Sequence, residues 1–365
     1  MSIEQTAAAN AATQSRCPAD GVVPGGYARV STILALAPLL GQFDVHLGDV
    51  LAVSGLPADQ FDNPDHLIPF REGSRMLGLC ADHTGCAHLG LLIGKHTPLE
   101  SLGIVAELVL SAPDVRSGLR LMVRYFTLTD GGGLLTLSES EHHAEFGYAL
   151  YEPGVVRAEL LYDIGLAIAW NVLRKLCGAR WTPDEVVFSR RTPIEPGPYR
   201  TFFKAPLRFD ADRSVLVFNR EWLDAPLATR DPVRLRSLEE QVREREMLSA
   251  GGLPAQVRRI LRRQLLHGTH SMQLVADELA LHRRTLDRRL QDDQVTFRAL
   301  VDEVRFEVSR QLLETNMPVA DIAQSLQYAN PAAFTRAFRR WAGVTPQAWR
   351  STHRSKPVAT EADTQ

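Results

Sequence analysis

The sequence predicts an α+β N-terminal domain joined to an all-α C-terminal domain that contains two helix-turn-helix motifs. Near the C-terminus a short pattern occurs twice, as Val275–Leu279 and Ile322–Leu326, and each copy leads through a turn into an arginine-bearing helix. Upstream, apolar residues recur first at helical intervals and later in runs typical of strands. We therefore expect a helical first half, then an antiparallel sheet of about four strands with a long helix.

Composition limits the architecture and locates the basic part of the chain. A chain of 365 residues with 45% hydrophobic content is long enough for two or three domains with their own cores. The net charge of −2 hides an asymmetry, because residues 253–355 hold 16 arginines and 10 acidic residues, a net charge of +6, and the remainder carries −8. Only the C-terminal part should therefore be attracted to phosphate.

The expected boundaries follow the changes in pattern along the chain. The segments are a disordered tail (1–26), a regulatory domain (27–224), a linker helix and hinge (225–252), a DNA-binding domain (253–352) and a second disordered tail (353–365). The linker begins with the breakers Pro226 and Pro232, continues as a charged helix over Pro232–Leu248 and ends in Ser249–Gly252.

The N-terminal domain changes its hydrophobic period about halfway along. Helical spacing is found in four segments, Ile33–Leu40, Leu47–Val53, Arg75–Ala81 and Ile104–Leu110. Strands are expected over Leu134–Ser138, Ala144–Leu150, Glu185–Arg190 and Ser214–Phe218. A long apolar helix over about Val155–Cys177 lies between the second and third of these strands.

The two helix-turn-helix units are expected over residues 271–291 and 318–341. A small residue in each first helix, Ala276 or Ala323, lets the second helix pack closely across it. Ser271 can cap the first helix of the first unit, and Asn330 followed by Pro331 is a favourable start for the recognition helix of the second. The second unit has one extra turn residue, within 329–331.

A rotation of 100° per residue shows which side chains face outward on each second helix. Arg284 and Arg288 lie opposite the apolar Leu286 and Leu290, and Ala332 and Arg336 lie opposite Phe334 and Phe338. Arginine can bond both acceptors of a guanine edge or neutralise a phosphate. These arginines could instead only solvate a helix surface, but two copies in phase with two apolar stripes favour DNA contact.

One amphipathic helix should connect the two units. Apolar residues recur at intervals of three and four from about Thr296 to Glu314, at Phe297, Leu300, Val301, Val304, Val308 and Leu312. A stiff connector fixes the separation of the two recognition helices. We therefore expect contact with two half-sites about one helical turn apart, roughly 34 Å.

The segment Asp321–Arg350, which includes Asn330-Pro331 and the ending Gly343-Val344-Thr345-Pro346, resembles the signature of the AraC/XylS family of bacterial transcription regulators. The resemblance extends over about Leu253–Arg350 and implies base contacts at the outward positions. With Thr285 added from the flank, the expected base-contacting residues are Arg284, Thr285, Asp287, Arg288, Ala332, Thr335 and Arg336. The expected phosphate-contacting residues are Arg283, Arg289, Asn330, Arg339 and Arg340.

The N-terminal part, through Leu47–Leu51 and Thr84–Gly94, is similar to the ligand-binding, arabinose-binding-like region of one branch of the same family. The similarity covers roughly residues 27–220. It implies a domain that responds to a small-molecule effector and that can also supply a dimerisation surface. It does not identify the effector or the residues that bind it.

Several residues suggest other chemistry. Cys80, His83, Cys86 and His88 lie close in sequence, but the last two follow the helix-ending Gly85, so convergence on one metal is not expected. Gly131–Gly133 precedes a strand, which indicates a turn and not a phosphate loop. We expect no cofactor, no metal and no catalytic constellation.

The same sequence contains neither a signal peptide pattern nor an apolar run of membrane-spanning length. The four cysteines, Cys17, Cys80, Cys86 and Cys177, are widely scattered, which favours the cytoplasm over a disulfide-stabilised fold.

Three function classes remain. The favoured hypothesis is a transcription factor that binds double-stranded promoter DNA as a homodimer, contacts RNA polymerase and activates transcription in response to its effector, coupled through residues 232–252. An enzyme fused to a DNA-binding module would show turnover by its N-terminal part. An architectural protein would bind any duplex with similar affinity.

Overall fold

The computed structural model describes residues 22–152, 154–248, 252–266, 270–279, 281–314 and 317–353. Its internal contacts divide the chain into two compact units between Gln256 and Val257. Most of the two predicted disordered tails lies outside the described residues. Val22 and Val23, which were predicted to lie in the first tail, are instead buried, and the amide of Val23 donates to the carbonyl of Thr127 at 3.1 Å.

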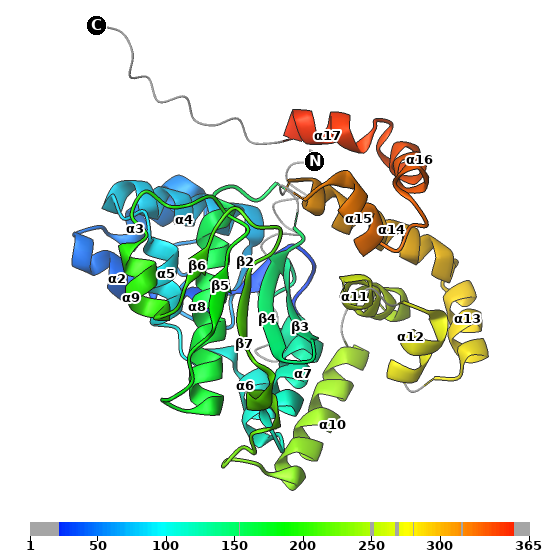
Figure 1. Cartoon of the computed structure of the whole chain (residues 1–365), viewed down its shortest axis with the longest axis horizontal. Helices are drawn as coiled ribbons and strands as arrows, with labels where there is room; N and C mark the ends of the chain where they lie inside the picture. The colour runs from blue at the N-terminus through cyan, green and yellow to red at the C-terminus, as the bar shows by residue number, and fades with distance from the viewer. Residues whose placement is uncertain are drawn as a thin grey trace, which may run out of the picture. The chain divides into compact units, whose positions relative to one another are not determined.

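The first half of the N-terminal unit is helical, as predicted, with one small antiparallel sheet in which Tyr27 lies opposite Pro69. Helices form in all four predicted segments, and α5 and α7 are additional (Figure 1). The elements are β1 (Tyr27–Arg29), η1 (Val30–Ile33), α2 (Leu36–Leu40), η2 (Gly41–Phe43), α3 (Leu47–Ser54), β2 (Leu67–Pro69), α4 (Phe70–Thr84), α5 (Leu89–Lys95), η3 (Leu99–Leu102), α6 (Ile104–Ser111), α7 (Val115–Tyr125) and η4 (Phe126–Leu128).

The second half contains a five-stranded sheet in the order β3-β4-β7-β5-β6. Strands form in the four predicted segments, but β6 was not predicted, and it pairs in parallel with β5, so the sheet is mixed and not purely antiparallel. The elements are β3 (Gly133–Glu139), β4 (His143–Leu150), α8 (Ala158–Cys177), β5 (Glu185–Val187), α9 (Gly197–Phe203), β6 (Leu207–Arg208), β7 (Val215–Asn219) and η5 (Arg220–Asp224).

The long helix α8 packs against both β4 and α5. Ala144, Phe146 and Tyr148 alternate along β4 and are all buried. On α5, two glycines four residues apart allow the backbones to approach closely, because a Cβ at Gly90 would lie 2.4 Å from the carbonyl oxygen of Leu160. A Cβ at Gly94 would lie 2.6 Å from that of Ile164, so both positions require glycine.

The charged helix α10 (Pro232–Leu248) has the predicted bounds but is not a free-standing linker. It packs against α6, where Leu238 and Val242 join the main hydrophobic core. The carboxylate of Asp231 accepts the amides of Val233 and Arg234 at 3.0 and 2.9 Å and so caps the helix. The structure therefore assigns this helix to the N-terminal unit, and the predicted hinge at 249–251 lies outside the described residues.

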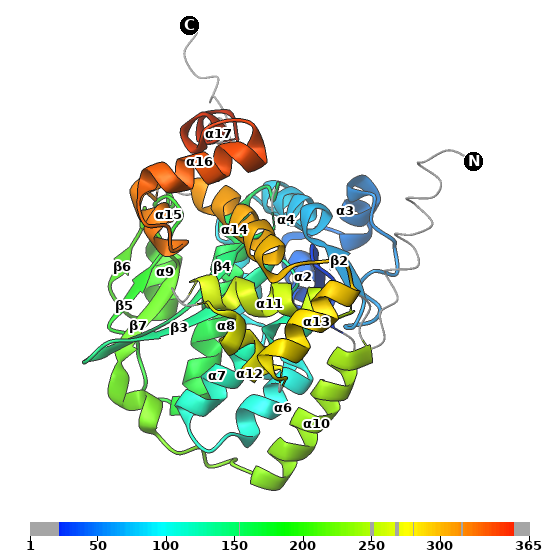
Figure 2. The same cartoon turned by 90° about the vertical axis from the view of Figure 1, so that its right-hand side faces the viewer.

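The C-terminal unit is entirely helical in its described residues. Figure 2 shows α14 connecting a group of three helices at its start to a second group at its end. Two ion pairs join α11 to α14, Arg258 with Glu303 at 2.7 Å and Arg262 with Glu307 at 2.6 Å. The helices are α11 (Gly252–Leu266), α12 (Met272–Glu278), α13 (Arg283–Asp292), α14 (Phe297–Glu314), α15 (Val319–Ser325), α16 (Pro331–Ala342) and α17 (Pro346–His353).

Candidate nucleic-acid interface and a buried cavity

The two predicted helix-turn-helix units have the same turn. In the first, the amide of Leu281 donates to the carbonyl of Ala276 at 2.8 Å, and in the second Tyr328 donates to Ala323 at 2.9 Å. Both alanines are fully or almost fully buried. The second recognition helix begins eight residues after its alanine and the first begins seven after, so the extra turn residue is Ala329.

Side-chain caps start both recognition helices. The carboxamide oxygen of Asn330 accepts the amide of Ala333 at 2.9 Å, as expected for an N-cap. His282 has the same role in the first unit, since its Nδ1 lies 3.3 Å from the amide of Arg284. At the start of α12, Ser271 accepts the amide of Leu274 at 3.1 Å. These caps fix where each recognition helix begins and hence which residues face outward.

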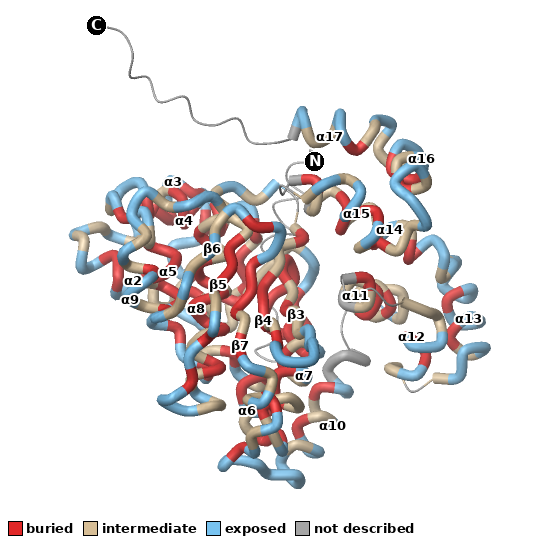
Figure 3. Tube along the Cα trace, in the orientation of Figure 1, coloured by how far each residue is buried: buried red, intermediate tan, exposed pale blue. Residues whose placement is uncertain are grey.

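Most of the twelve predicted DNA-contacting residues are exposed, while the apolar stripes behind them are buried (Figure 3). Leu286, Leu290, Phe334 and Phe338 each have 0% exposure. Ten of the twelve side chains are exposed, namely Arg283, Arg284, Asp287, Arg288, Arg289, Asn330, Ala332, Arg336, Arg339 and Arg340. Thr285 and Thr335 are half-buried.

Some of these side chains already have intramolecular partners. The hydroxyl of Thr335 donates to the carbonyl of Pro331 at 2.9 Å, and Gln291 donates to the carboxylate of Asp287 at 3.3 Å. Arg340 forms an ion pair with Asp302 of α14 at 3.1 Å. The guanidinium of Arg336 has no hydrogen bond or ion pair to the described part of the chain, so it can bond a ligand without first breaking one.

A groove of about 590 Å³ separates the first half of α14 from α16. Arginines predominate among its charged residues, with Arg298 and Arg305 on α14 facing Arg336 and Arg340 on α16, against the single carboxylate of Asp302. The complete lining is Phe297, Arg298, Val301, Asp302, Arg305, Tyr328, Ala333, Arg336, Ala337 and Arg340. The groove is therefore strongly cationic and continuous with the second recognition helix.

Two of these arginines were missed by the sequence analysis, which considered only the apolar face of the connecting helix. Arg298 and Arg305 are seven residues apart, so they lie on one helix face, and this spacing is visible in the sequence. The guanidinium carbon of Arg305 lies 4.7 Å from the ring centre of Tyr328. Burial raises the pKa of this tyrosine to about 12, so its phenol stays protonated and uncharged.

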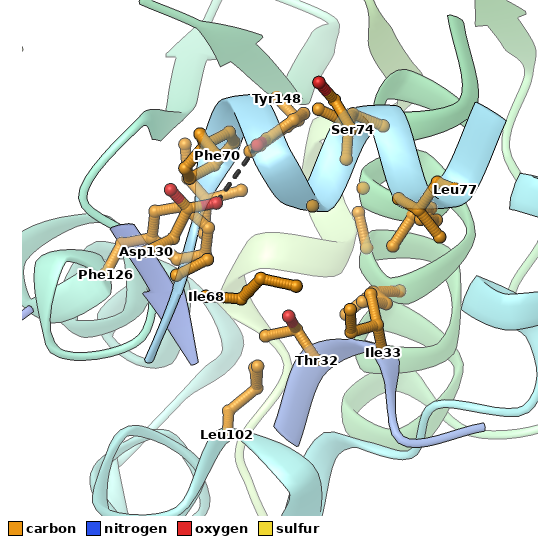
Figure 4. A pocket seen from close by; sticks show the side chains of 18 of the residues that line it. Thr32, Ile33, Ile68, Phe70, Ser74, Leu77, Leu102, Phe126, Asp130 and Tyr148 are labelled. Carbon is orange, nitrogen blue, oxygen red and sulfur yellow. Dashed lines mark hydrogen bonds between the residues drawn. The ribbon is translucent and has the colours of Figure 1, made fainter. Parts of the chain in front are cut away.

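The N-terminal unit encloses an apolar cavity of about 70 Å³ at its centre (Figure 4). The wall is formed by η1, β2, α4, α7, β3, β4 and α8, so helices and sheet both contribute. Its apolar and glycine residues are Ala28, Ile33, Ile68, Phe70, Gly73, Leu77, Leu102, Met122, Phe126, Leu135, Leu161, Ile164, Gly165, Ile168 and Ala169. Thr32, Ser74, Asp130 and Tyr148 are the polar residues of the lining.

Asp130 forms a polar end to this cavity. One of its carboxylate oxygens accepts the amides of Gly132 and Gly133 at 2.8 and 2.6 Å, and the other accepts the hydroxyl of Tyr148 at 3.0 Å. Burial raises the pKa of Asp130 to about 6, although all three hydrogen bonds lower it. The rings of Phe70 and Phe126 lie near this group in Figure 4.

The glycine run before β3 serves this end of the cavity. A Cβ at Gly132 would lie 2.4 Å from the ring of Phe70, and one at Gly133 would lie 2.3 Å from the hydroxyl of Tyr148. The glycines therefore let two aromatic side chains of the cavity wall lie directly against the backbone. The sequence indicated a turn here but gave no sign of these partners.

The Cys80 group gives no metal site. Cys80 and Cys86 are buried thiols, and burial raises the pKa of Cys80 to about 12, which disfavours the thiolate that a metal needs. Over the residues that the structure describes, no three His, Cys, Asp or Glu side chains are placed to hold a metal ion. Within the same residues, no single helix is long and apolar enough to cross a membrane, and two sharply bent helix pairs reach that length and composition only jointly.

A second buried polar cluster joins α8 to α9. The hydroxyl of Tyr199 donates to the carboxylate of Asp163 at 2.6 Å, and Arg190 pairs with the same carboxylate. Burial raises the pKa of Asp163 to about 6, against the opposing charge of Arg190. The three side chains satisfy one another inside the fold, so a structural role accounts for them.

Family models match both parts of the chain. A model described as the arabinose-binding domain of AraC transcription regulators, N-terminal, matches residues 45–227. A helix-turn-helix domain model matches residues 275–352.

Similar proteins include named regulators. The HTH-type transcriptional regulator VqsM of Pseudomonas aeruginosa is 30% identical over 72% of this chain and 83% of its own length. The HTH-type transcriptional regulator VirS of Mycobacterium tuberculosis is 28% identical, with 76% and 82% covered. The ornithine utilization regulator of Pseudomonas aeruginosa is 25% identical, with 90% and 96% covered. A crystal structure of the transcriptional regulator CdpR from Pseudomonas aeruginosa matches with 23% identity and a TM-score of 0.41, over 84% of this chain and 96% of that one.

Proposed function

The chain belongs to the AraC family of transcription regulators, and we propose that it binds two adjacent half-sites of promoter DNA and activates transcription when a small molecule occupies its N-terminal domain. One observation supports this most directly: two equivalent turns present two capped, arginine-bearing helices from one continuous connector. That arrangement suits two successive major-groove segments on one face of a duplex.

The two recognition helices would differ in how they contact DNA. On α13, Arg284, Asp287 and Arg288 offer both donors and an acceptor to base edges, with Thr285 beside them. On α16, Arg336 is the principal donor, because Ala332 is apolar and the hydroxyl hydrogen of Thr335 is already used within the helix. We therefore expect the second half-site to be recognised through fewer direct base contacts and more through DNA shape.

Phosphate contacts would position both helices. Arg283 and Arg289 flank the base-contacting face of α13, and Asn330, Arg339 and Arg340 do so on α16. The groove between α14 and α16 adds Arg298 and Arg305, and its charge suits one backbone phosphate between the two half-sites. Asp302 would have to give up Arg340 when that phosphate enters.

The cavity of the N-terminal unit is the proposed effector site, because ligand sites in proteins are concave, mostly apolar and provided with a few fixed polar groups. A contiguous path leads from it to the linker. Leu102 of η3 and Met122 of α7 line the cavity, both elements pack on α6, and α6 packs on α10. Occupation of the cavity would thereby change how α10 is held, and with it the presentation of the DNA-binding unit.

Homodimer formation, contact with RNA polymerase and a cytoplasmic location complete the proposal, in keeping with regulators named in the same family. Dimerisation predicts a solution mass of twice the 40.5 kDa chain. Polymerase contact predicts that transcription from a cognate promoter rises in a purified system of polymerase, template and this protein alone.

The DNA-binding part of the proposal is tested by selection. The full chain is incubated with a pool of random duplexes at physiological salt, and bound sequences are enriched over several rounds. We expect a bipartite consensus that binds at least about a thousandfold more tightly than random DNA. Equal affinity for all duplexes would instead identify an architectural protein.

A further inference from the structure

We infer that the cavity of the N-terminal unit takes an uncharged, largely apolar small molecule, and that neither a sugar nor a carboxylate is its ligand. The inference rests on the proposed function in one respect, namely that this cavity is the effector site. It departs from the name of the matching family model, which describes an arabinose-binding domain.

Every polar side chain in the wall already has a partner inside the protein. The hydroxyl of Thr32 donates to the carbonyl of Arg29 at 2.9 Å, and that of Ser74 donates to Arg71 at 2.9 Å. Both oxygens of Asp130 accept hydrogen bonds, one of them from Tyr148. The wall therefore offers a ligand few free hydrogen-bonding groups.

A sugar needs many such groups. Each buried hydroxyl left without a partner lowers affinity by roughly 5- to 150-fold, and a pentose carries four hydroxyls. The apolar and glycine residues that make up most of the wall supply no side-chain donor or acceptor to any of them. The composition of this cavity thus disfavours arabinose, whatever its family members bind.

Charge excludes the next class of ligand. None of the described residues that line the cavity is Lys, Arg or His, so a carboxylate would enter without a counter-ion. Its nearest charged neighbour would be the carboxyl of Asp130, which repels an anion. A cation would have to displace Tyr148 from Asp130 or share its oxygen, so an uncharged ligand fits with the least rearrangement.

Size limits the occupant as well. The volume of about 70 Å³ is roughly half that of an engineered apolar cavity that binds benzene. A small apolar molecule enters with little movement, and a ring-sized one requires some of the wall to shift. Leu77 of α4 lines the cavity, so its replacement by alanine should create room for a ring.

The test uses thermal unfolding of the full chain with four probes at equal concentration: toluene, benzoate, benzylammonium and L-arabinose. The first three share one ring and differ in charge. We expect toluene alone to raise the midpoint of the N-terminal transition, with at least fivefold tighter binding to Leu77→Ala than to the unmodified protein. Leu173→Ala removes another fully buried leucine that does not line the cavity, so it should leave toluene binding unchanged.

A cavity-filling variant completes the set. Ala169 lines the cavity from α8, and Ala169→Leu should abolish the response to toluene. Stabilisation by L-arabinose or benzoate that Ala169→Leu removes would overturn the inference, and so would stronger stabilisation by benzylammonium that Asp130→Asn removes. Absence of any toluene response in both the unmodified protein and Leu77→Ala would overturn it too. Enrichment of DNA by the same preparations tests the proposed function separately, because it does not depend on the probes.

Discussion

Arg336 is the residue on which contact with the second half-site chiefly depends. Its side chain is exposed on α16, lines the cationic groove and forms no ion pair with the described part of the chain. Arg336→Ala should therefore change folding stability by less than about 0.5 kcal/mol, as is usual for exposed positions. Any larger loss must come from the complex with DNA.

The size of that loss distinguishes a base contact from a phosphate contact. A bidentate arginine–guanine contact discriminates by about 1–3 kcal/mol, which is roughly a 5- to 150-fold change in Kd. We expect Arg336→Ala to weaken binding to the selected consensus by this factor, to leave binding to random DNA nearly unchanged, and to relax preference at one base position.

The assay is competition binding at fixed salt, with Arg339→Ala as the matched control on the same helix. Arg339 is also exposed, but it is assigned to a phosphate, so its loss should weaken consensus and random DNA by similar factors. If Arg336→Ala behaves as Arg339→Ala is expected to, with equal losses on both DNAs, then Arg336 contacts the backbone and the assignment is wrong.

Three further predictions concern the groove, a cap and the cavity. Arg298→Ala should make the slope of log K against log salt shallower by about 0.9, since one phosphate contact is lost, and an unchanged slope would remove Arg298 from the interface. Asn330→Ala should cost about 1 kcal/mol of unfolding free energy in the C-terminal unit, measured by urea unfolding, whereas Asn330→Gly should cost less because glycine is tolerated at an N-cap. The third follows from Asp130, whose pKa is raised from 3.8 to about 6 in the folded protein: the folded state binds the proton more tightly, so its contribution to stability is lost as pH rises from about 4 to 6. Asp130→Asn should flatten that part of the stability profile, and an unaltered profile would assign the pH dependence to other groups.

The C-terminal unit could be predicted closely because its signals are local. The repeated pattern gave both turns, the apolar stripes gave the buried faces of α13 and α16, and Asn330-Pro331 gave the start of α16. Each of these depends on residues within about four positions of one another, where helix geometry fixes the neighbours.

Long-range pairing defeated the same reasoning in the N-terminal unit. The strand β6 has only two residues, Leu207–Arg208, and its parallel pairing with β5 has no local pattern to reveal it. The cavity is similar, because Asp130 and Tyr148 are brought together by the pairing of β3 with β4 and by close contact with glycine backbone. The linker helix α10 was found with correct bounds, but its apolar residues Leu238 and Val242 were too few to show that it docks on α6.

The arginines of α14 were overlooked for a different reason. The sequence shows Arg298 and Arg305 on one face of the connecting helix, but their meaning depends on α16 lying opposite, which only the packed unit provides. A basic residue on a helix usually contacts solvent, and the sequence gave no ground for treating these two otherwise.

The central claim is that a stiff connector holds two recognition helices at one fixed separation, and altered half-site spacing tests it most directly. The selected consensus is compared with versions in which about 5 or about 10 base pairs are inserted between the half-sites, half a turn or a full turn of the duplex. We predict that the half-turn insertion lowers affinity to that of a single half-site and that the full-turn insertion does not restore it, since α14 cannot lengthen. Equal affinity for all three spacings would contradict the account.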